Sequence, residues 1–127
     1  MQLSGQIKEI GGRVEHSVQF LLEGSDGEMA TLTIETAAKV AMEGGVVRKF
    51  DPERPPERRV LGDIISTEAG VLRVREDGTL TIQAGSTSVV VSPDPDFEAW
   101  SIDYEDGRKL VCLPGGDIAR WGLREET

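Results

Sequence analysis

The feature that most constrains this chain is an Asp-Gly dipeptide that occurs three times between runs of alternating apolar and polar residues. The three dipeptides are Asp26-Gly27, Asp77-Gly78 and Asp106-Gly107. Aspartate tolerates a left-handed backbone and glycine adopts it freely, so Asp-Gly between alternating runs is a strong signal for a β-hairpin. Three such units predict at least six antiparallel strands.

The runs on either side of the dipeptides carry the period of two that is typical of half-buried strands. The clearest run is residues 14–22, and similar runs flank the other two dipeptides within residues 72–82 and 100–112. The spacing between the turns is unequal, which argues against a solenoid or a propeller. Three hairpins that share one core are the better interpretation.

The remaining segments give weaker patterns. Residues 1–10 indicate a short strand, for which an edge position is one option, and residues 86–92 form a β-branched strand. Residues 36–42 fit either a helical turn or a continuing strand. Residues 46–50 indicate a strand after a glycine turn, and a single helical turn is possible at 57–61.

We therefore expect residues 1–127 to form a single, mainly β domain. It would contain an antiparallel sheet of about three Asp-Gly hairpins, closed into a small barrel or packed as a sandwich, with at most one short helix. The chain has no run of about 18 apolar residues and no secretory signal, so we expect no membrane span. With one cysteine and no export signal, a cytoplasmic location is the simplest expectation.

Charge narrows the range of partners. The chain carries 23 acidic and 14 basic residues, giving a net charge of −9. Nucleic-acid binding needs a concentration of positive charge that the scattered basic residues do not supply, so we expect no nucleic-acid partner. An acidic surface favours solubility and steers basic partners.

Residues for catalysis or metal binding are scarce. His16 is the only histidine and Cys112 the only cysteine, and each lies in an apolar run where a structural role is the simpler interpretation. Two such ligands cannot form a zinc site, and the acidic residues lack the spacing of a calcium loop. We predict no catalytic residue, no metal and no cofactor, and we lean towards a protein that is not an enzyme.

The residues most open to a binding role lie near the third hairpin. Asp94, Asp96 and Glu98 alternate along the chain and would form an acidic rim, with Trp100 and Tyr104 close by. A solvated surface explains the carboxylates equally well, and a place in the core or at its rim explains the aromatic residues.

The segment Pro114-Gly115-Gly116 is interpreted as a structural turn. Proline presets φ at the first central position and glycine supplies positive φ at the next. The turn would return the chain to the core and deliver Trp121 to the sheet.

Residues 97–121 also carry a resemblance. Phe97-Glu98-Ala99-Trp100, the Asp106-Gly107 turn and Leu113-Pro114-Gly115-Gly116 followed by Trp121 resemble a family of small β-rich proteins of unknown function. This family is bacterial and mainly actinobacterial. The resemblance implies no activity, cofactor or catalytic residue, although some such families look like immunity or accessory proteins.

Three functional hypotheses follow. The leading one is a non-enzymatic cytoplasmic binding domain, immunity-like or accessory, that binds a basic protein partner. The alternative is a small-molecule binder or an enzyme with a pocket near Trp100, Tyr104 and His16. A third is a homodimer formed through an exposed strand edge.

Overall fold

The computed structural model describes residues 2–9, 18–24, 27–41, 45, 47–52, 54, 57 and 70–122. It is mainly β, and all of its strand pairings are antiparallel, which confirms the predicted fold class. A short 3-10 turn, η1 (Pro114–Gly116), is its one named helical element within these residues. The strands are β1 (Gln2–Glu9), β2 (Val18–Gly24), β3 (Met29–Ile34), β4 (Ala38–Ala41), β5 (Val47–Phe50), β6 (Gly70–Val74), β7 (Leu80–Ala84), β8 (Thr87–Val91), β9 (Trp100–Tyr104), β10 (Lys109–Cys112) and β11 (Ile118–Trp121).

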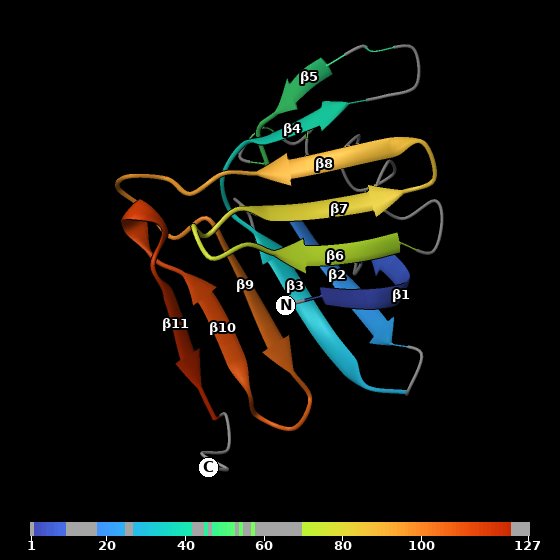
Figure 1. Ribbon diagram of the computed structural model, residues 1–127, viewed down its shortest axis with the longest axis vertical. Helices are drawn as coiled ribbons and strands as arrows, with labels where there is room; N and C mark the ends of the chain where they lie inside the picture. The colour runs from blue at the N-terminus through green and yellow to red at the C-terminus, as the bar shows by residue number, and fades with distance from the viewer. Residues whose placement is uncertain are drawn as a thin grey trace.

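All three predicted hairpins are present, as β2–β3, β6–β7 and β9–β10 (Figure 1). In the second hairpin the Arg75 N–H donates to the Thr79 carbonyl at 2.9 Å, so only Glu-Asp-Gly lies in the loop. The last loop residue, Gly78, has φ +91°, and Gly107 in the third hairpin has φ +99°. The left-handed glycine that closes a three-residue hairpin loop therefore occurs twice in the same place.

The strand β1 links the two halves of the sheet. Its first half pairs with β6 and its second half with β2, and Gly5 faces Gly70 on one side and Gly24 on the other. The predicted option of an edge position for this segment is therefore wrong. A glycine inside a strand marks a tight bend, and Gly5 inside β1 meets the last residue of β2 and the first residue of β6 where the sheet changes direction.

The order of strands is β11-β10-β9-β3-β2-β1-β6-β7-β8-β4-β5. The ladder bends at β1 into two layers of five strands, and β5 and β11 are its two ends. The packing is therefore sandwich-like and not a closed barrel (Figure 1). Residues 38–41 form strand β4, which settles the choice between strand and helical turn there. The helical turn predicted at 57–61 lies, apart from Glu57, outside the described residues.

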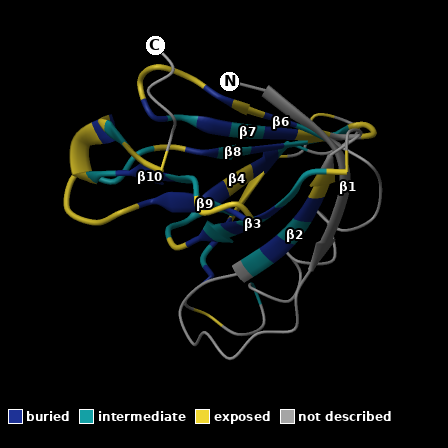
Figure 2. Ribbon diagram, turned by 90° about the horizontal axis from the view of Figure 1, so that it is seen from below, coloured by how far each residue is buried: buried dark blue, intermediate teal, exposed yellow. Residues whose placement is uncertain are grey.

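The core lies between the two layers, where every second residue of most strands is buried (Figure 2). The burial of β3 alternates strictly, as its sequence pattern predicts. Burying each large apolar side chain contributes about 1.5–3 kcal/mol before entropy is counted. The largest fully buried side chains are Trp100, Phe20, Leu32, Ile34, Leu72, Leu80, Ile82, Ile102 and Val40.

Candidate binding groove

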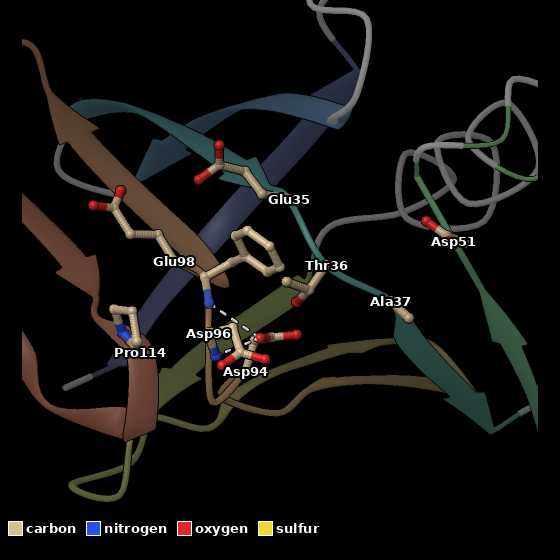
Figure 3. A pocket seen from close by; sticks show the side chains of 9 residues that line it. Glu35, Thr36, Ala37, Asp51, Asp94, Asp96, Glu98 and Pro114 are labelled. Atoms are coloured by element: carbon tan, nitrogen blue, oxygen red, sulfur yellow. Dashed lines mark hydrogen bonds between the residues drawn. The ribbon is translucent and has the colours of Figure 1, made fainter.

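A solvent-open groove of about 700 Å³ lies where several strand ends meet (Figure 3). We call it the acidic groove, because five of its lining side chains are carboxylates and none of the described lining residues is basic. Its described lining consists of Glu35, Thr36, Ala37, Asp51, Asp94, Asp96, Phe97, Glu98 and Pro114.

Segments far apart in the sequence build the groove. They are the connection from β3 to β4, the residue after β5, the connection from β8 to β9, and η1 (Figure 3). The Glu35 N–H donates to the Ala99 carbonyl at 2.9 Å, which ties the first connection to the third. The Gly115 N–H donates to the Asp94 carbonyl at 2.9 Å and ties η1 to the same rim. Backbone hydrogen bonds therefore hold the groove walls together.

The side chain of Asp94 fixes the backbone of the rim by hydrogen bonding. Its Oδ1 accepts hydrogen bonds from the backbone N–H groups of Asp96 at 2.8 Å and Phe97 at 3.0 Å. Aspartate commonly fixes a turn by bonding the backbone two residues further on. This turn leaves the side chains of Asp96, Phe97 and Glu98 exposed at the rim.

The groove disturbs the ionisation of Glu35. Partial burial raises the pKa of Glu35, the negative charge of Glu98 raises it further, and Lys109 opposes them with a smaller effect. The contribution of Glu98 reflects the negative charge that this neighbour adds to the groove. The electrostatics of the groove therefore favour a positively charged occupant.

Thr36 contributes an unsatisfied group. Its Oγ1 is buried and has no hydrogen-bond partner, the one such side-chain atom found in the described part of the chain. A buried polar group without a partner costs about 1–3 kcal/mol. No sequence pattern points to Thr36, since its burial depends on how the connections pack.

The structure divides the predicted binding residues into two groups. Asp94, Asp96 and Glu98 line the acidic groove, as a contiguous rim would. Trp100 is fully buried, and Tyr104 is only 8% exposed, so both aromatic side chains lie in the core instead. Figure 3 places the three carboxylates together with Glu35, while Asp51 lies apart, beside β5.

Tyr104 has a separate environment at the turn of the third hairpin. The Arg108 guanidinium lies 4.2 Å from the centre of its ring. Arg108 also forms ion pairs with Glu28 at 2.7 Å and Asp106 at 2.8 Å. This cluster joins the turns of the first and third hairpins, whose strands β3 and β9 are neighbours.

Catalytic and metal-binding groups do not gather in the described residues. Cys112 is fully buried, and burial raises the pKa of its thiol. His16 lies outside the described residues. Within the described ranges, no three His, Cys, Asp or Glu side chains are placed to hold a metal ion. The same ranges contain no helix with the length and apolar character needed to cross a membrane.

The turn-forming segment Pro114–Gly116 lies beside the groove. Pro114 contributes to the lining, and Gly116 packs against the turn of the second hairpin. A Cβ on Gly116 would lie 2.4 Å from the Asp77 carbonyl oxygen, so only glycine fits there without a shift of the backbone.

Comparison with known proteins gives one positive result. No curated protein and no solved structure matches the chain. A family model matches residues 7–122, which is nearly the whole chain. This chain therefore belongs to a family of unknown function, DUF6188.

Proposed function

We propose that this chain is a non-enzymatic binding protein whose acidic groove receives a positively charged surface of a protein partner. The observation that carries the proposal is the groove lining, which contains five carboxylates, four of them close together, and no described basic residue. Negative charge concentrated in a concave surface raises the local concentration of cationic groups and speeds association.

Phe97 favours a protein segment over an inorganic cation. Its side chain is 68% exposed and lies between the carboxylates of Asp96 and Glu98 in the sequence. Lysine and arginine side chains lay their aliphatic stems on apolar surfaces while their charged heads remain solvated or paired. The exposed Phe97 ring can contact the aliphatic stem of a basic side chain. The carboxylates of Asp96 and Glu98 can pair with its charged head.

The concrete form that we favour is a cytoplasmic bacterial protein of the immunity type, which masks a basic toxin. The net charge of −9 supports it, because charge complementarity sets both association rate and choice of partner. The competing function, a pocket for a small molecule or substrate at His16, Trp100 and Tyr104, has less support. Both of those aromatic side chains are buried and do not line the groove.

Affinity capture from the native host tests the proposal with three baits. These are the wild type, the groove variant D96N/E98Q, and the control variant E23Q/E105Q, which removes two exposed carboxylates that do not line the groove. We expect a basic protein to enrich on the wild type and the control at low salt, and to be lost on the groove variant. Equal enrichment on all three baits, or no salt-sensitive basic protein at all, would reject the proposal.

A further inference from the structure

The layer formed by β6, β7, β8, β4 and β5 has a charge opposite to that of the chain as a whole. None of the residues in these five strands is acidic, whereas Lys39, Arg48, Lys49 and Arg73 are basic. The whole chain carries 23 acidic and only 14 basic residues. The strands of this layer therefore form a positive region in an acidic protein.

Strand register brings part of this charge together. Lys39 on β4 lies directly opposite Lys49 on β5, and both side chains are exposed on the outer surface. No ion pair to either lysine is found among the described residues. Like charges directly opposite each other across a strand pair are destabilising. An anion placed beside Lys49 would relieve this repulsion.

The strand β5 also offers an edge with which no described strand pairs. It is the last strand of the ladder and pairs only with β4 among the described strands. Figure 1 shows it at the outer end of its layer. Val47 on this strand is 62% exposed. An open strand edge presents backbone N–H and C=O groups to which an extended peptide can add.

We propose that β5 docks an extended acidic segment of another protein by strand addition. The backbone of that segment would pair with β5, one carboxylate would lie beside Lys49 and another beside Arg48, and an apolar side chain would cover Val47. Directly opposed residues on neighbouring strands bring their Cβ atoms within about 4.5–5.5 Å, close enough for these ion pairs.

A protein segment fits this edge better than a nucleic acid does. Single-stranded nucleic acids gain affinity by stacking bases on aromatic side chains. The only aromatic residue in the five strands is Phe50, and it is buried. The net charge of −9 also opposes a long polyanion, whereas a short acidic segment meets only the positive strands.

Charged residues at sheet edges also prevent unwanted strand pairing, and a peptide-binding experiment separates the two roles. The full chain is titrated against three fluorescein-labelled peptides, and anisotropy is measured. The peptides are Thr-Glu-Glu-Val-Thr-Thr, which in antiparallel pairing sets its glutamates opposite Lys49 and Arg48 and its valine opposite Val47, the same peptide with proline as its fourth residue, and Thr-Lys-Lys-Val-Thr-Thr. We expect the first peptide to bind and the proline peptide, equal in charge, to bind at least about tenfold more weakly, because proline interrupts strand pairing.

Charge variants of Arg48 and Lys49 test whether the acidic peptide binds at β5. R48E/K49E should weaken binding of the first peptide by at least about tenfold and increase binding of the lysine peptide. The neutral variant R48Q/K49Q should weaken the first peptide with no gain for the lysine peptide, and circular dichroism checks that both variants fold. D96N/E98Q should leave binding of the first peptide unchanged, since it alters only the acidic groove. No binding to the wild type, equal binding of both acidic peptides, or displacement of the first peptide by a DNA oligonucleotide of equal charge would overturn the proposal.

Discussion

The indole N–H of Trp100 donates a 2.8 Å hydrogen bond to the backbone carbonyl of Gly78, and this bond joins the two layers of the fold. Trp100 begins β9, whereas Gly78 closes the turn between β6 and β7. The thiol of Cys112 lies 3.5 Å from the same carbonyl oxygen. One carbonyl in the second Asp-Gly turn therefore fixes how the third hairpin packs against the second.

The substitution W100F tests how much the buried indole and its hydrogen bond to Gly78 contribute to the free energy of unfolding. It removes the indole donor and leaves a cavity in a fully buried position, so we expect a loss of about 3 kcal/mol in the free energy of unfolding. The control W121F changes a tryptophan that is 51% exposed and should cost less than about 1 kcal/mol. Chemical denaturation followed by circular dichroism measures both. Similar costs for the two variants would show that the bond to Gly78 does not join the layers.

Two glycines that occupy the same place in their turns should differ sharply in their tolerance of alanine. A Cβ on Gly78 would lie 2.5 Å from the Gly116 carbonyl oxygen, whereas a Cβ on Gly107 would meet nothing within 4 Å. Both have positive φ, so each alanine carries about 1–2 kcal/mol of backbone strain. Only G78A adds a clash, and we expect its melting temperature to fall well below that of G107A. Equal melting temperatures would mean that the two turns are not packed as described.

The hairpins could be predicted from the sequence because their information is local. An Asp-Gly turn and the alternation on either side of it lie within about a dozen residues, and β6–β7 and β9–β10 form as this pattern indicates. The place of β1 could not be predicted in this way. Its partners β2 and β6 are set by packing of the two layers, and the glycines at 5, 24 and 70 meet only in the folded chain.

Only part of the acidic groove could be predicted from the sequence. Asp94, Asp96 and Glu98 are neighbours in the sequence, so a rim could be expected there. Glu35 and Asp51 come from other strand ends, and no sequence pattern links them to this rim. Alternation in β9 could show that Trp100 and Tyr104 share a face, but not that this face is the core.

Glu35 should make stability depend on pH. Its pKa is raised above the usual 4.5 in the folded chain, mainly by burial and then by Glu98, so folding favours its protonated form. The stabilisation that folding gains from protonated Glu35 is fully present below the pKa of Glu35 in the unfolded chain. It is lost as pH rises through the pKa of Glu35 in the folded chain. E35Q should therefore melt higher than the wild type near pH 7, with a smaller difference near pH 4. A difference that grows on acidification would contradict this.

Cys112 should be inert in the folded protein. Its side chain is fully buried, burial raises the pKa of the thiol, and the Sγ atom lies 3.5 Å from the Gly78 carbonyl oxygen. The thiolate is the reactive form, so a disulfide reagent such as DTNB should react only when the core opens. We expect the native rate to be below about 1% of the rate in denaturant. Rapid native reaction would place the thiol at the surface.

The acidic groove as a receptor for basic protein segments is tested most directly by NMR titration of the ¹⁵N-labelled chain with a hexalysine peptide. We predict that the largest backbone shifts fall on residues 35–37 and 94–98, that they shrink as salt is added, and that D96N/E98Q removes most of them while E23Q/E105Q does not. Shifts spread evenly over all acidic residues, or equal losses in the two variants, would contradict the claim that this groove binds cationic partners.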